Sequence, residues 1–389
     1  MRRLVSRYGR EGVCSVVHGN TGRAPSNKLP EVMVERVAQL CGEGGKYNGF
    51  NTSHARDMLE EQEGLIACRS TVYGWLRKAG IVQPGKQAKH RRKRRERRSA
   101  RGMMIQIDGS PHDWLEGRGP RMSLMGAVDD ASGEMLYGTF RPTEDQAGSL
   151  MMLRSIAIEY GLPESVYHDR HTILRSPKEP TIEDELAGKL PESQVQRVMR
   201  ELGTESIPAG SPQAKGRIER LWGTLQDRLT KEMRLAGVCT IDQANAFLEQ
   251  FIPRYNQRFG RQPANPEDAW VQLEPDTDIP YYFSTAETRT VKADNTVSWK
   301  GATLQLHPTA THRRLEGKTI DVHTTPEGDI YLYDGKTRLN YKPIQQRSAV
   351  PQPSIAKPTP PATKAKDTHA AARKRAWLYG KQPTTGAML

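Results

Sequence analysis

Residues 103–140 read MMIQIDGSPHDWLEGRGPRMSLMGAVDDASGEMLYGTF, and this stretch decides the fold. A short apolar run of strand length ends on Asp108, a second covers 122–128, and a third covers 134–140 after a Ser132-Gly133 turn. Closely spaced strand signals with turn residues between them predict an antiparallel meander of three strands.

The first of these strands is mostly apolar on both faces, so it is predicted to be central and buried, with Asp108 projecting from its end. A carboxylate in such a place is costly unless it is paired, hydrogen-bonded or bound to a metal. Asp108 is therefore the first candidate for a functional residue.

The length of 389 residues indicates two to four domains. No long apolar span and no signal-peptide pattern is present, which favours a soluble, cytoplasmic, nucleoid-associated protein without a membrane partner. The four cysteines form no CxxC pair, and this argues against a disulfide framework and a cysteine zinc site.

The net charge of +13 is concentrated in one segment, residues 86–101, which holds ten Lys/Arg against one Glu. Such a run has no large apolar residues to bury in a core. It is either a solvated linker or a segment that binds a polyphosphate electrostatically, with an affinity that falls as the salt concentration rises. Its place between two segments with nucleic-acid features favours DNA contacts by Arg91, Arg92, Lys93, Arg94 and Arg95 within a basic linker, 83–101.

Residues 1–28 are predicted to be a partial helical unit and a linker, and their abrupt start suggests an N-terminally shortened chain. Residues 29–82 carry three helical patterns, at 31–41, at 54–62 after a Thr52-Ser53 cap, and at 71–78. Such bundles often have no DNA role, but the polar, basic last helix and the adjoining linker favour a helix-turn-helix. Its predicted DNA-binding residues are Arg69, Ser70, Thr71, Tyr73, Arg77 and Lys78.

Residues 102–275 form the predicted α/β core. After the meander we expect a helix over 142–160, a strand over 164–168 that ends before Asp169, and an inserted loop at 175–190. A helix over 194–202 and a strand over 205–209 follow, and Ser211-Pro212 begins a long helix that runs to about Met233.

The long helix places an apolar stripe against the predicted sheet, with Glu219 at its edge. An ordinary surface glutamate is the alternative, and for most helical glutamates it is the correct one. The region 278–345 changes to the strand period, with six short strands that suggest a small β-barrel, and 346–389 is predicted to be a disordered tail.

Carboxylates on separate elements suit a hard divalent cation if the fold brings them together. Two such ions about 3.5–4 Å apart activate a nucleophile and stabilise the leaving oxygen in phosphodiester chemistry. Spacing alone leaves Asp108, Asp129, Asp130 and Asp169 as candidates, although Asp129 and Asp130 more readily serve the turn before Ser132.

Several motifs together resemble the insertion-sequence DDE transposases with a retroviral-integrase-type catalytic core, in particular the ISNCY-like group. The motifs are IQIDGSPHDW, LMGAVDDASGEMLYGTF, HDRHTIL, SPQAKGRIERLWGTLQDRL and, after the core, YNQRFGRQPANPEDA. The resemblance implies a ribonuclease H-like fold with Asp108, Asp169 and Glu219 as catalytic and metal-binding residues. It also implies two Mg²⁺ or Mn²⁺ ions per site.

Two departures from the family pattern are visible. Arg170-His171 follow Asp169 where many integrases have Asn-Gly, and 49 residues separate Asp169 from Glu219, more than in compact retroviral integrases. Near the glutamate, Lys215, Arg217 and Arg220 resemble residues that hold substrate phosphates, and a solvated basic helix end is the alternative. For His168 and His171 a structural or phosphate-neighbouring role is expected, and a metal-binding or acid/base role is the alternative.

The resemblance predicts a transposase that binds the terminal repeats of a mobile element, cleaves at its ends and joins them to target DNA as a homo-oligomer on double-stranded DNA. A DNA-binding regulator without catalysis, or a ribonuclease H-like nuclease, are the alternatives. The sequence has no Gly-rich phosphate loop of the GxxxxGK[ST] kind, so no nucleotide cofactor is expected.

Overall fold

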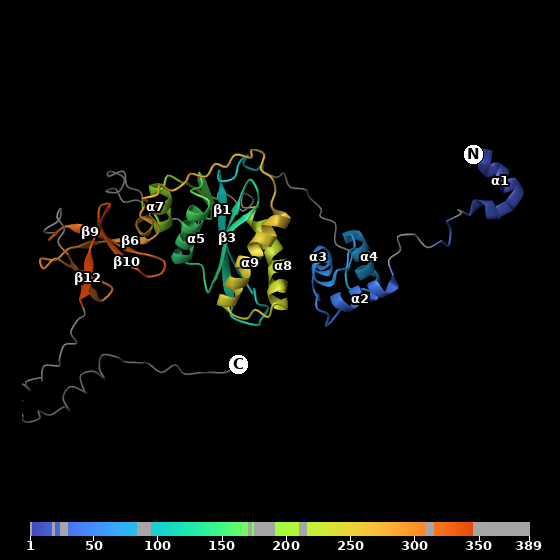
Figure 1. The fold of residues 1–389 in the computed structure, drawn as a ribbon, viewed down its shortest axis with the longest axis horizontal. Helices are drawn as coiled ribbons and strands as arrows, with labels where there is room; N and C mark the ends of the chain where they lie inside the picture. Colours follow the sequence, from blue (N-terminus) through green and yellow to red (C-terminus); the bar gives the residue numbers. More distant parts are fainter. Residues whose placement is uncertain are drawn as a thin grey trace, which may run out of the picture.

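The computed structural model describes residues 2–17, 20–23, 30–83, 95–169, 173–174, 191–209, 216–307 and 315–344. Figure 1 shows a helical part, an α/β core and a β-rich C-terminal part following one another along the long axis. The predictions for Arg91 to Arg94, His171, Lys215, the loop 175–190 and the tail 346–389 concern residues outside the described ranges. None of the described helices has the length and apolar composition needed to cross a bilayer.

The N-terminal segment contains α1 (Arg2–Glu11) and a 3₁₀ turn (Gly12–Val16). The helical part then has the three predicted helices, α2 (Glu31–Cys41), α3 (Thr52–Glu63) and α4 (Arg69–Lys78), around an apolar core that includes Val37, Leu59 and Leu76. The cap of α3 was misassigned. The side chain of Asn51, and not Thr52 or Ser53, accepts hydrogen bonds from the first amides of that helix.

The core is built on one mixed sheet in the order β3-β2-β1-β4-β5. The strands β1 (Ile105–His112), β2 (Met122–Asp129) and β3 (Met135–Arg141) form the predicted antiparallel meander. The strands β4 (Ser165–His168) and β5 (Glu205–Pro208) continue the sheet parallel to β1.

β1 is central, as predicted, but it does not end at Asp108. Its pairing with β2 continues through Gly109 to His112, so Asp108 lies in the middle of the strand. The glycine and serine after Asp108 were interpreted as a turn, but here they are paired strand residues because β2 offers hydrogen-bond partners along the whole length.

Helices cover both faces of the sheet (Figure 1). On one face, α5 (Gln146–Glu159) and α7 (Gln194–Glu201) pack over an apolar cluster that includes Ile105 and Ile107. On the other, α8 (Ile218–Leu235) and α9 (Ile241–Phe259) pack over a cluster that includes Trp222 and Leu248. The mixed sheet with these helices fits the ribonuclease H-like core that the resemblance implied.

Two helices differ from the sequence prediction. α8 begins at Ile218, seven residues after the Ser211-Pro212 start, and residues 210–215 lie outside the described part. α9 was not predicted, although Thr240 and Gln243 form a capping box at its start. Its apolar residues then recur at helical spacing and were a usable signal.

The C-terminal part starts with a short helix, α10 (Ile279–Tyr282), which packs on the core. Seven strands follow: β6 (Thr285–Thr290), β7 (Thr296–Trp299), β8 (Ala302–Leu306), β9 (Thr319–Thr324), β10 (Ile330–Asp334), β11 (Thr337–Leu339) and β12 (Tyr341–Ile344). They pair as two sheets, β11-β10-β9-β6 and β12-β8-β7, around one apolar core. Among the described residues the two sheets are not joined into one ladder, so closure into a barrel stays a prediction.

Candidate active site

Asp108 and Asp169 come from neighbouring parallel strands. β1 and β4 pair at Ile105–Val166 and Gln106–Tyr167, so Asp108 lies two residues further along β1 and Asp169 directly follows the end of β4. The carboxylates that the sequence placed on separate elements are therefore brought to the same edge of the β1–β4 pair.

Both aspartates line one small cavity beneath α5. The other residues around it are Ile107, Gly109, Met125, Glu144, Ser149, Met152, Ile173 and Leu174. Apolar walls around carboxylates lower the local dielectric constant, which strengthens any interaction with a cation.

Glu144 is a third carboxylate in this cavity, and sequence analysis missed it. The hydroxyl of Ser123 donates to Glu144 Oε1 at 3.2 Å. A Cβ at Gly109 would come within 2.0 Å of Glu144 Cδ, so the glycine makes room for this carboxyl group. An acidic residue immediately before the α5 cap was the available signal, but it was interpreted only as a helix start.

The first turn of α8 lies over the same part of β1. Gln106 Oε1 accepts a hydrogen bond from the Ile218 amide at 3.3 Å, and Trp222 Nε1 donates to Asp108 Oδ2 at 3.1 Å. Glu219 lies between these two contacts in sequence and is exposed. Trp222 was predicted as a core residue, and its indole N–H also binds Asp108.

The three carboxylates that the resemblance implies as catalytic residues are thus only partly brought together. Asp108 and Asp169 share a cavity, whereas Glu219 does not line it. Within the described ranges, no three His, Cys, Asp or Glu side chains lie close enough together to hold a metal ion. The oxygen donors of the two aspartates fit a hard divalent cation, and Glu219 is the acidic residue of the first turn of α8.

Asp129 and Asp130 are fully buried and have structural partners. Asp129 accepts hydrogen bonds from the amide and hydroxyl of Ser132 and from the Gly102 amide, in agreement with its predicted turn role. Burial raises the pKa of Asp129 above its ordinary value although these hydrogen bonds oppose the shift.

Asp130 joins three segments. It pairs with Arg95 at the end of the basic linker and with Arg217 Nε at 3.2 Å, next to α8. It also accepts hydrogen bonds from the Arg98 amide at 2.9 Å and from Gln106 Nε2 at 3.0 Å. Arg95 and Arg217, both predicted to contact DNA, are therefore anchored by an internal carboxylate.

Around this anchor the arginines are crowded. Arg97 donates to the carbonyl oxygens of Asp130 and Ala131. Burial, followed by the nearby Arg217 and Arg261, lowers the pKa of Arg97. A cationic cluster of this kind favours an anion, and Arg97 was not among the predicted DNA-binding residues.

The predicted contact residues of α4 lie on the part of the helix that does not pack into the helical core. Val72 and Leu76 of that helix are buried. The predicted DNA-binding side chains are exposed or half-buried: Arg69, Ser70, Thr71, Tyr73, Arg77 and Lys78. Arg220 of α8 is also exposed.

His168 has a structural role. Its Nδ1 lies 2.5 Å from the carbonyl oxygen of Asp169, and its Nε2 lies 2.8 Å from the hydroxyl of Ser206. Because the carbonyl only accepts, Nδ1 carries the proton, and in the neutral ring Nε2 accepts from Ser206. The ring thereby ties β4 to β5 immediately beside Asp169.

The mixed sheet with helices on both faces fits a ribonuclease H-like core, and comparisons with known proteins identify the family. Residues 192–259 match the model of the integrase core domain. A putative transposase, y4bF, of Sinorhizobium fredii is 33% identical over 332 residues, which cover 85% of this chain and 71% of the relative. The transposase for insertion sequence IS1202 of Streptococcus pneumoniae is 27% identical over 67% of this chain and 62% of its own length.

Solved integrases are more distant. A simian T-cell lymphotropic virus intasome with the PP2A regulatory subunit B56 gamma covers 70% of this chain and 90% of its own, at 16% identity and a TM-score of 0.36. The catalytic core domain of BIV integrase covers 42% of this chain and 91% of its own, at 14% identity and a TM-score of 0.28. These TM-scores are too low to support a statement about the fold.

The chain belongs to the insertion-sequence transposases with a retroviral-integrase-type core.

Proposed function

We propose that this chain is an active DDE transposase that binds the terminal repeats of its element, cleaves the DNA at the element ends and joins the freed 3′ ends to target DNA. The observation that carries the proposal is the shared cavity of Asp108 and Asp169, which come from adjacent parallel strands. The exposed Glu219 on the first turn of α8, between the contacts to Gln106 and Asp108, supports its place as the third carboxylate.

Asp108 and Asp169 would hold divalent ions jointly, and Glu219 would complete one site. Two Mg²⁺ or Mn²⁺ ions, when bound, lower the pKa of a water or 3′-hydroxyl nucleophile and neutralise the charge on the leaving oxygen. The hydrogen bond from Trp222 keeps the Asp108 carboxylate in one orientation.

DNA would be held at two places on the chain. The exposed face of α4 supplies Arg69, Ser70, Thr71, Tyr73, Arg77 and Lys78 for a major groove. The arginines near Asp130, together with Lys215 and the linker residues Arg91 to Arg94, would contact phosphates close to the catalytic carboxylates. Because transposition joins both ends of an element, we expect a multimer of this chain on DNA.

The test uses a labelled duplex that carries the repeat flanking this chain's own gene, Mg²⁺ and a supercoiled target plasmid. Asp108→Asn, Asp169→Asn and Glu219→Gln are each expected to abolish strand transfer, while binding to the duplex stays within about threefold of wild type. Glu205→Gln, at an exposed carboxylate on β5, is the matched control and should keep full activity. An active Asp108→Asn protein refutes the assignment.

The products also separate the two alternatives. A catalytically inactive DNA-binding regulator gives a bound complex and no products. A nuclease of the same fold gives nicks without joined strands. Joined products from the wild-type protein exclude both.

A further inference from the structure

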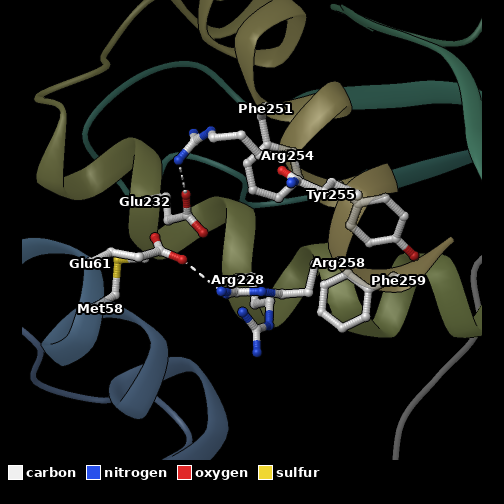
Figure 2. A pocket seen from close by; sticks show the side chains of 10 residues that line it. Met58, Glu61, Arg228, Glu232, Phe251, Arg254, Tyr255, Arg258 and Phe259 are labelled. Carbon is white, nitrogen blue, oxygen red and sulfur yellow. Dashed lines mark hydrogen bonds and ion pairs between the residues drawn. The ribbon is translucent and has the colours of Figure 1, made fainter. Parts of the chain in front are cut away.

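The helical part contacts the catalytic core through one polar surface. Asp57 of α3 pairs with Arg228 NH2 of α8 at 2.8 Å and with Arg258 NH1 of α9 at 2.6 Å. His54 Nε2 lies 3.1 Å from Glu232 Oε1. Figure 2 shows this boundary, with Met58 and Glu61 of α3 facing Arg228 and Arg258. We call this set, Asp57 and His54 with Arg228, Glu232 and Arg258, the clasp.

Further bonds extend the clasp along α8. Arg258 NH2 also binds Glu61 Oε1 at 2.6 Å, and Arg234 NH2 donates to the Asn48 carbonyl at 2.6 Å. The Asn51 side-chain amide donates to Asp227. The cationic groups of Lys231 and Arg234 lie 5.8 and 5.7 Å from the centroid of the Phe50 ring.

Four of the five clasp residues are buried, and the fifth, Arg258, is exposed. This burial distinguishes the clasp from an incidental surface contact. Exposed fractions are 4% for Asp57, 0% for His54, 7% for Arg228 and 8% for Glu232. Burial by itself raises the pKa of Asp57, but Arg56 and Arg228 lower it below its ordinary value, so the carboxylate is charged and paired. Removing charged groups from water is unfavourable unless well-oriented, specific partners compensate them.

The surrounding interface is polar and open. Arg254 pairs with Glu232 Oε2 at 3.4 Å, on the wall of a cavity of about 450 Å³ between α3, α8 and α9 (Figure 2). The acidic residues Asp57 and Glu61 of the helical part oppose arginines of the core. Complementary charge of this kind sets orientation more than affinity.

One helix connects the clasp to the catalytic residues. α8 carries Glu219 and Trp222 in its first turns and Asp227, Arg228 and Glu232 in its second half. Among the described residues, the polar contacts across the boundary come from α3 and from residues 48–51, and the polar face of α4 is exposed. The helical part is therefore held on the catalytic helix while its predicted DNA-reading face stays accessible.

We propose that the clasp fixes the helical part on α8 and α9 and thereby sets the distance between the DNA sequence read by α4 and the phosphodiester that is cleaved. This proposal rests on the proposed function. Without the clasp, the linker alone determines where the catalytic carboxylates meet the DNA, and cleavage is no longer confined to one position.

The experiment compares full-length wild type with Asp57→Arg, which opposes Arg228 and Arg258 with a like charge. Glu60→Arg is the matched control, because Glu60 lies on the same helix and its ion pair is with Arg56, also of α3. The double variant Asp57→Arg/Arg228→Asp reverses the pair. Arg258→Glu breaks the clasp from the core side and keeps the test valid if Asp57→Arg misfolds.

Two readouts are measured. X-ray scattering of the DNA-free protein gives the radius of gyration, which should rise for Asp57→Arg and Arg258→Glu and return toward the wild-type value in the reversed pair. Nucleotide-resolution mapping on the labelled repeat duplex gives the cleavage position. We expect one position for wild type and Glu60→Arg, and several positions for the clasp variants with duplex affinity within about threefold of wild type.

A clasp variant that retains the wild-type radius of gyration overturns the clasp, and one that cleaves only at the wild-type position overturns its role in cleavage. Wild-type protein that binds the duplex but never cleaves it overturns the proposed function and the cleavage role together. In that case the scattering comparison still decides whether the clasp holds the two parts together.

Discussion

At the residue scale, the position of Asp108 is stabilised by a residue from a distant part of the chain. A half-buried carboxylate in the middle of a central strand needs hydrogen-bond donors, and Trp222 provides one from α8. The same indole fills the apolar cluster between the sheet and α8. One side chain therefore packs the core and positions a catalytic candidate.

The first prediction follows from this double role. Trp222→Phe keeps most of the packing and removes the N–H donor, so the Asp108 carboxylate loses its fixed orientation. We expect the cleavage rate to fall about tenfold, equivalent to about 1.4 kcal/mol, with a higher Mg²⁺ concentration needed for half-maximal rate.

A matched control is Trp75→Phe, at a half-buried indole of the helical part. It should leave the Mg²⁺ dependence unchanged. If Trp222→Phe loses thermal stability but retains the wild-type Mg²⁺ dependence, the indole packs without positioning Asp108.

At the element scale, Asp130 holds the end of the basic linker, β1 and the start of α8 to one another. Arg95, Arg217 and Gln106 all direct donors at this carboxylate, which is fully buried. A buried carboxylate of this kind stabilises the fold only while all of its partners are present. Removing the charge of Asp130 leaves the Arg217 guanidinium without its negative partner.

Asp130→Asn is accordingly expected to lower the free energy of unfolding by about 3 kcal/mol. Urea titration followed by tryptophan fluorescence measures the change. Asp242→Asn, at an exposed aspartate in the first turn of α9, is the control and should alter stability by less than about 0.5 kcal/mol. Equal stabilities of the two variants would contradict the role of Asp130 as an anchor.

At the scale of the whole molecule, each part has its own apolar core, and polar contacts link neighbouring parts. The C-terminal part also packs on the catalytic core through the apolar residues of α10. The C-terminal part is linked to α7 through Arg197, whose guanidinium donates to the carbonyl oxygens of Tyr282 and Ser284. Beside this link, the buried His323 stacks on Tyr281 and lies 2.7 Å from the Ser284 hydroxyl.

His323 makes the stability of the C-terminal part depend on pH. Burial lowers the pKa of His323 from 6.5 to about 4, so the folded state holds the neutral ring and the unfolded chain takes up the proton first. The stabilisation is complete above about pH 6.5 and is lost as the pH falls toward 4, by about 3 kcal/mol in all.

The measurement compares the unfolding free energies of wild type and His323→Phe between these two pH values. The phenylalanine keeps the stacking on Tyr281 but cannot titrate. Wild type should lose stability relative to the variant on acidification, and a constant difference between the two proteins would show that His323 is not responsible.

Much of this protein could be predicted from local sequence patterns. The meander, the three helices of the helical part and the strands of the C-terminal part follow from periodicity and turn residues, because neighbouring residues alone determine those signals. The family motifs likewise identified the transposase class, and they placed Asp108 and Asp169 where the sheet brings them together.

The tertiary structure decided what depends on residues far apart in the chain. The extension of β1 past Asp108 requires the full length of β2, and the cavity shared with Glu144 requires Gly109 to lie against it. The clasp joins Asp57 to Arg228 and Arg258, and no spacing pattern relates these residues. The sequence by itself determined the elements and the family, since both are encoded locally, whereas packing between distant segments determined which charges are buried, paired or left for DNA.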